Sequence, residues 1–214
     1  ESYSNEKRFI AGVVGPTGKM ATISPVVDDP TFRDVTFKDF VASFIPQIEG
    51  LVDGGVDLLL IETAFDTLVA KAALKAANDV FDSKGKKLPI MVSATFSDQS
   101  DRMLAGQTLE AFVTSLSSYE LFSIGLNCST GAQEMIPLIK RLDNVSPFRI
   151  SAHPNAGFPD LDGNYTQSVE ELTTLLEPLI KERRLNIVGG CCGTTPIHIA
   201  ALAKIVKQGK QREL

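Results

Sequence analysis

The chain has 214 residues, of which 43% are hydrophobic and 22% charged, and its formal net charge is −5. This length and composition suit one globular domain with a sizeable core, and the negative charge, with no basic and aromatic patch, excludes nucleic-acid binding. Because no apolar run reaches the length of a membrane span and the three cysteines do not form a secreted disulfide framework, we expect a cytoplasmic protein that does not bind membranes.

Six strand–helix units are predicted in chain order. The strands are expected at 9–14, 56–61, 88–95, 122–126, 148–152 and 185–188, and a helix follows each of them. Strict alternation of this kind predicts a parallel sheet. An open sheet collects its ligand residues mainly at one switch point, whereas candidate groups here follow the second, fourth, fifth and sixth strands. This distribution favours a (β/α)₈ TIM-type barrel with about six of the eight units present.

Four of the predicted helices begin at a polar residue that can accept a hydrogen bond from the free backbone N–H groups of the first turn. The expected N-terminal caps are Thr36 with Asp39, Thr63, Thr130 with Gln133, and Ser168 with Glu171. A further helix start follows Thr194 or Thr195, with Pro196 at the first helical position.

All three cysteines follow predicted strands. Cys128 ends the fourth strand, and Cys191 and Cys192 follow the sixth, with glycines on both sides that let the backbone bend. Buried core cysteines and a disulfide between the adjacent pair are the alternatives. Neither explains why every cysteine lies at a strand end, so the pattern favours a metal site built from thiolates.

Three other residues are candidates for the same site. Glu62 follows a buried strand directly, where a carboxylate either stabilises the start of a helix or binds a cationic substrate amine. His153 and His198 could complete a metal site, but a strand-end role is favoured for His153 and a capping or surface role for His198.

Several segments in order resemble the homocysteine S-methyltransferase family, and within it the homocysteine-binding module of cobalamin-dependent methionine synthase. The similarity extends from Phe9 to Val206, and the segments that carry it are Gly15-Pro16-Thr17-Gly18, Glu62-Thr63-Ala64-Phe65-Asp66, Gly125-Leu126-Asn127-Cys128-Ser129, Pro154-Asn155-Ala156-Gly157 and Gly190-Cys191-Cys192-Gly193-Thr194-Thr195-Pro196.

The resemblance implies a (β/α)₈ barrel in which Cys128, Cys191 and Cys192 hold a catalytic Zn²⁺. That ion would bind homocysteine as a thiolate, which accepts a methyl group to give methionine. Glu62 would bind the homocysteine amine, and Asn155 is the second substrate-binding residue that it implies. The methyl group would come from methylcobalamin, and ultimately from methyltetrahydrofolate, on the cobalamin and folate modules of the full-length enzyme.

The first two strand–helix units of the family have no counterpart in residues 1–214, which open without an initiator methionine. We therefore expect an N-terminally incomplete homocysteine and zinc domain that is inactive alone and self-associates through exposed barrel edges. The alternatives are a homocysteine methyltransferase that uses betaine or S-methylmethionine, and a non-catalytic fragment that binds zinc or cycles as a redox dithiol.

Overall fold

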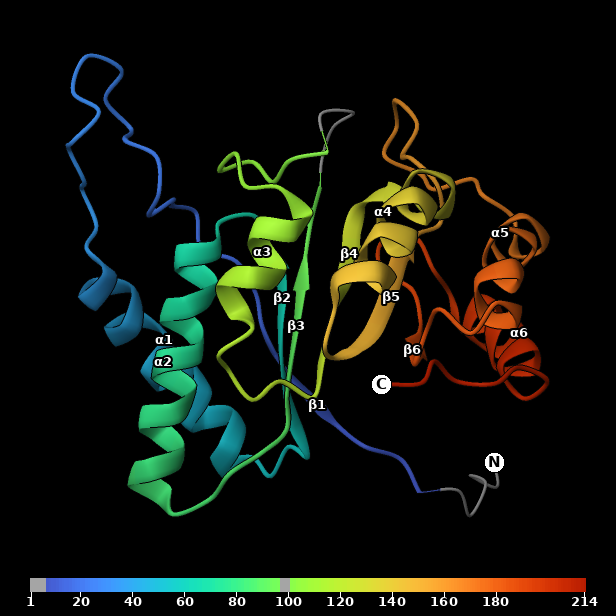
Figure 1. Ribbon diagram of the computed structural model, residues 1–214, viewed down its shortest axis with the longest axis horizontal. Coiled ribbons are helices and arrows are strands. Elements are labelled where there is room, and N and C mark those ends of the chain that lie inside the picture. Colours follow the sequence, from blue (N-terminus) through green and yellow to red (C-terminus); the bar gives the residue numbers. More distant parts are fainter. Residues whose placement is uncertain (1–6, 97–100) are drawn as a thin grey trace.

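The computed structural model describes residues 7–96 and 101–214. Six parallel strands form one sheet in sequence order (Figure 1). They are β1 (Ala11–Val14), β2 (Leu58–Ala64), β3 (Ile90–Ala94), β4 (Ser123–Gly131), β5 (Arg149–Asn155) and β6 (Ile187–Val188). The prediction of a parallel sheet built from alternating units is confirmed, and the sheet is that of a partial barrel. The first five residues, on which the expectation of missing upstream sequence partly rests, lie outside the described residues.

A helix follows every strand and covers the outer face of the sheet (Figure 1). The helices are α1 (Phe37–Asp53), α2 (Thr67–Lys84), α3 (Leu109–Leu116), α4 (Ala132–Val145), α5 (Val169–Lys181) and α6 (Pro196–Val206). In α1 the apolar residues recur every four positions, so that Phe40, Phe44, Ile48 and Val52 share one face and are all buried. No helix in the described residues is long and apolar enough to cross a membrane.

The two faces of the sheet differ in chemistry because successive side chains in a strand point in opposite directions. One row of paired residues belongs to the apolar core under the helices: Ile61, Val92, Ile124 and Ile150. The next residues along β3, β4 and β5, which are also paired in register, lie on the opposite, inner face: Ser93, Gly125 and Ser151. The inner face thus carries small or polar side chains directly below the carboxyl ends of the strands, where the cysteines lie.

Of the five predicted helix starts, three are confirmed, among them Thr195 followed by Pro196 at the start of α6, and two are wrong. The structure has capping boxes at Thr36 with Asp39 and at Ser168 with Glu171. By contrast, α2 is capped by Asp66 instead of Thr63, and α4 begins after Gly131 without a side-chain cap.

The reason for both errors is that β2 and β4 extend further than predicted, so Thr63 and Thr130 remain in the strands. Asp66 is buried and caps α2 through Leu68 N–H, and its other carboxylate oxygen accepts from Ala21 N–H and Thr22 N–H. One carboxylate therefore fixes both the start of α2 and the loop after β1.

The outer strands β1 and β6 leave one backbone edge each without a partner strand in the described residues. Val13 is 43% exposed on β1, and Phe9 and Ile10 just before it are 63% and 66% exposed. Exposed apolar edges promote pairing between chains. We therefore expect the mass measured by light scattering to rise above the 23.1 kDa of one chain as the concentration increases.

The variant Val13→Lys places a charge on this edge and is expected to reduce the association. A mass that stays at 23.1 kDa over the whole concentration range would contradict the prediction.

Candidate metal centre

The structure brings the three cysteine sulfurs together, although Cys128 is 63 residues or more from the other two in sequence. The Cys128 Sγ–Cys192 Sγ distance is 3.7 Å and the Cys191 Sγ–Cys192 Sγ distance is 4.0 Å. All three sulfurs lie within 4.8 Å of one another, and no histidine or carboxylate joins this group in the described part of the chain. The cluster is formed where β4 and β6 end, because parallel strands bring their carboxyl ends to one rim.

An irregular segment at the end of β4 presents Cys128. The pairing of β4 with β5 is regular up to Asn127 and resumes only at Gly131. Within the interruption, Cys128 and Ser129 adopt left-handed backbone conformations with φ of 60° and 57°. Such conformations are costly for non-glycine residues and persist only where the surroundings hold them. Here they turn the Cys128 thiol toward the end of β6.

Backbone hydrogen bonds to the end of β5 hold the other two cysteines. Cys191 N–H donates to the Pro154 carbonyl at 2.9 Å, and Ala156 N–H donates to the Cys192 carbonyl at 2.9 Å. The buried Asn155 side chain accepts from Cys192 N–H through Oδ1 at 3.0 Å. Asn155 therefore positions Cys192 in this structure, while its role in substrate binding stays a prediction.

The buried Asn127 side chain links three strands to the cluster. Its Oδ1 accepts from Thr63 N–H at 2.8 Å and from the Ser93 hydroxyl at 2.6 Å. Its Nδ2 donates to Thr63 Oγ1 at 2.8 Å and lies 3.9 Å from Cys191 Sγ. These bonds hold Thr63, whose φ is 58°, in a left-handed conformation beside Glu62. One amide thus connects the residue after Glu62 to a cysteine of the cluster.

The spacing and chemistry of the sulfurs fit a zinc ion. Three cysteine thiolates are a common donor set for zinc, and sulfurs held tetrahedrally at about 2.3 Å from zinc are roughly 3.8 Å apart. The observed separations of 3.7 and 4.0 Å are close to this value. Without a metal, burial and the two neighbouring sulfurs raise the pKa of Cys191 to about 12. Metal binding must therefore displace a proton from Cys191 at neutral pH.

Neither histidine belongs to the cluster. The Nδ1 atom of His198 accepts from Thr195 N–H at 3.1 Å in a capping box, and its Nε2 lies 3.3 Å from the Gln167 carbonyl oxygen. The capping role expected for His198 is confirmed. His153 lies within β5 against Gly189, and burial lowers the pKa of its imidazole.

Glu62 lies near the end of β2, directly after Ile61, where the pairing of β2 with β3 becomes irregular. Partial burial raises the pKa of its carboxyl group. No basic partner for Glu62 is found within the described residues, whereas most other carboxylates with a shifted pKa have a hydrogen-bond or ion-pair partner. A half-buried carboxylate without a cation partner is suited to binding an ammonium group from a ligand.

Tyr165 is a residue of the site that sequence reasoning missed. It lies in the loop between β5 and α5, against Gly193, the residue after Cys192. Partial burial and the nearby cysteines raise the pKa of Tyr165. Nothing in the periodicity of residues 157–168 indicates this contact, because it depends on how the loop folds back.

The fold and the cluster together define a barrel-type protein with a cysteine-based centre on the carboxyl rim of its strands. The chain belongs to the homocysteine S-methyltransferase family, whose sequence profile matches residues 1–206.

Solved structures agree with this fold. The homocysteine methyltransferase MmuM from Escherichia coli, in its apo form, is similar with a TM-score of 0.64 and 23% identity. That match covers 92% of this chain and 62% of MmuM, so the chain spans less than two thirds of that protein. The metallated form of MmuM matches with a TM-score of 0.59 and 23% identity, over 80% of this chain and 53% of MmuM.

Proposed function

We propose that the chain is the homocysteine-activating part of a zinc-dependent S-methyltransferase, which transfers a methyl group to the homocysteine sulfur and gives methionine. The observation that carries this proposal is the group of three cysteine sulfurs, spaced as zinc ligands at the rim of the sheet. Membership of the homocysteine S-methyltransferase family supports the choice of substrate.

In this proposal Cys128, Cys191 and Cys192 hold the zinc ion and leave its fourth position to the substrate. Zinc supplies Lewis acidity, which lowers the pKa of a bound thiol so that it is deprotonated at neutral pH. Asn155 and Asn127 keep two of the cysteines in place from below. The Glu62 carboxylate binds the homocysteine ammonium group and thereby orients the substrate sulfur toward the cluster.

Methylcobalamin is the proposed methyl donor, delivered by the cobalamin and folate modules of a full-length enzyme. The resemblance of the segment Pro154-Asn155-Ala156-Gly157 to the cobalamin-dependent branch supports this donor over betaine or S-methylmethionine. Inactivity of the 214-residue chain alone is part of the proposal. Binding of zinc and homocysteine is therefore a better readout than turnover.

The variant Glu62→Gln tests the substrate site. It should weaken homocysteine binding to the zinc-loaded chain by roughly 10- to 100-fold, because a hydrogen bond between charged groups contributes about 1.5–3 kcal/mol. Zinc content should not change, since Glu62 lies outside the cysteine cluster. Isothermal titration calorimetry with homocysteine and metal analysis measure the two quantities.

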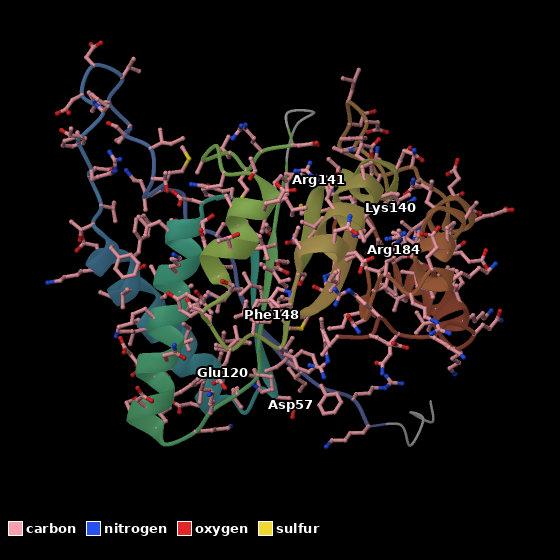
Figure 2. All side chains as sticks on the ribbon, in the orientation of Figure 1. Asp57, Glu120, Lys140, Arg141, Phe148 and Arg184 are labelled. Atoms are coloured by element: carbon pink, nitrogen blue, oxygen red, sulfur yellow. The ribbon has the colours of Figure 1, made fainter. Side chains whose placement is uncertain are left out.

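Glu120→Gln is the matched control, because Glu120 lies at the opposite end of the sheet beside Lys87 (Figure 2). Equal homocysteine affinity in wild type and Glu62→Gln would remove Glu62 from the site.

Titration of free thiols separates the metal site from the alternative of a redox dithiol. One bound zinc with all three thiols protected from alkylation supports the methyltransferase site. A disulfide between Cys191 and Cys192 in the purified chain, with no zinc bound, favours the redox fragment.

A further inference from the structure

Two irregular segments interrupt the sheet at its carboxyl rim, and each carries one part of the proposed site. The pairing of β2 with β3 shifts after Ile61, and the pairing of β4 with β5 shifts after Asn127. The residues that follow directly are Glu62 in the first segment and Cys128 in the second. Such irregularities redirect side chains and are frequent next to active sites. The relative position of the two segments therefore sets the spacing between the carboxylate and the sulfurs.

The buried side chain of Asn127 links the two segments directly. Its Oδ1 accepts from Thr63 N–H at 2.8 Å, and its Nδ2 donates to Thr63 Oγ1 at 2.8 Å, so two hydrogen bonds hold one residue. Because a backbone N–H can only donate, the amide oxygen has to face it, and this fixes the orientation of the whole amide. Thr63 shares a peptide bond with Glu62, so the backbone of Glu62 is held with it.

The remaining hydrogen-bonding positions of the Asn127 amide also face partners. Oδ1 accepts a second hydrogen bond from the Ser93 hydroxyl at 2.6 Å, and Nδ2 lies 3.9 Å from Cys191 Sγ. Turning the amide would leave a buried polar group without a partner, which costs about 1–3 kcal/mol. Asn127 is therefore a rigid spacer between the segment that carries Glu62 and the cysteine cluster.

Resting on the zinc and homocysteine site proposed above, we propose that Asn127 is a specificity-determining positioning residue, which matches the spacing between Glu62 and the cysteine cluster to the length of homocysteine. Homocysteine has one methylene more than cysteine between its α-carbon and its sulfur. When the ammonium group is bound at Glu62 and the sulfur at the cluster, a fixed spacing fits only one of these two lengths. A ligand of the other length loses one of its two attachments. One methylene in a fitted site changes affinity by about 10- to 200-fold.

Isothermal titration calorimetry of the zinc-loaded 214-residue chain with L-homocysteine and L-cysteine measures this selectivity. We expect the wild type to prefer homocysteine by about tenfold or more, and Asn127→Ala to reduce this preference by about tenfold, because Glu62 is no longer held at one spacing. The ligand 1-propanethiol presents a sulfur without an ammonium group, so its affinity should be the same in the two proteins.

Two milder variants separate this role from general destabilisation, and they serve as the test if Asn127→Ala does not fold. Ser93→Ala and Thr63→Ala each remove one hydrogen bond from the Asn127 amide, so they should lower the thermal midpoint by similar amounts. Only Thr63→Ala loosens the segment that carries Glu62. It should therefore reduce the preference for homocysteine, whereas Ser93→Ala should keep the wild-type preference.

Equal selectivity in wild type and Asn127→Ala, or equal losses in Ser93→Ala and Thr63→Ala, would overturn the inference and leave the proposed function intact. The same conclusion would follow from a zinc-loaded wild type that binds homocysteine and cysteine equally well. A wild-type chain that binds neither zinc nor homocysteine would overturn both the proposed function and this inference.

Discussion

Replacing Cys128 with alanine should abolish tight zinc binding by the chain. Structural zinc sites bind with about 10–16 kcal/mol, so the loss of one of three protein ligands removes roughly 3–5 kcal/mol, which lowers the affinity about 10²- to 10⁴-fold. The effect is large because the described residues offer no other histidine, cysteine or carboxylate within reach of the cluster to replace the lost sulfur. Competition with a chromogenic chelator measures the affinity.

Ser129→Ala is the control for this variant, because Ser129 shares the left-handed segment with Cys128 but carries no sulfur. Its zinc affinity should stay close to that of wild type. If Cys128→Ala retained wild-type zinc affinity, Cys128 would not be a ligand, and the metal site proposed here would be wrong.

Gly125→Ala should be the most destabilising single methyl addition in the sheet. A Cβ at Gly125 would lie 2.0 Å from Ser151 Oγ and 2.2 Å from the Ser151 carbonyl oxygen, and a backbone atom cannot rotate away. β4 and β5 would have to separate, at a cost of at least about 3 kcal/mol. For a chain of this size we expect the thermal midpoint to fall by roughly 6–12 °C in calorimetry.

Gly50→Ala is a control for which we expect the opposite effect on stability. Gly50 is exposed within α1 and has no atom within 4 Å of an added Cβ, so alanine should stabilise the chain by about 0.5–1 kcal/mol.

Because β4 also carries Cys128, Gly125→Ala should weaken zinc binding as well. A Gly125→Ala chain with the wild-type midpoint would show that the two strands separate at little cost.

The strand–helix alternation could be predicted from the sequence because each strand is a short apolar run and each helix repeats its apolar residues every three to four positions. The clustering of Cys128 with Cys191 and Cys192 was also predictable, since the carboxyl ends of parallel strands share one rim. Predicting this cluster required only the strand to which each cysteine belongs, and no precise knowledge of the loops.

The details that were missed depend on contacts between distant segments. The Asp66 carboxylate that caps α2 also accepts hydrogen bonds from the N–H groups of Ala21 and Thr22, which follow β1 and hold it in place. Thr63 is kept out of the helix by Asn127, 64 residues away. Tyr165 lies against Gly193, the residue after Cys192, only because its loop folds back. Local propensity carries no information about such contacts.

The shortness of β6 has a consequence for the dynamics of the chain. β6 has two residues, pairs only with β5, and leads directly to Cys191 and Cys192, whereas Cys128 belongs to the interior strand β4. With zinc bound as proposed, the ion cross-links the least supported strand to a well supported one. Local opening of the β6 edge and loss of the ion are then one coupled equilibrium, so metal occupancy sets how fast the amides of β6 exchange their hydrogens with solvent.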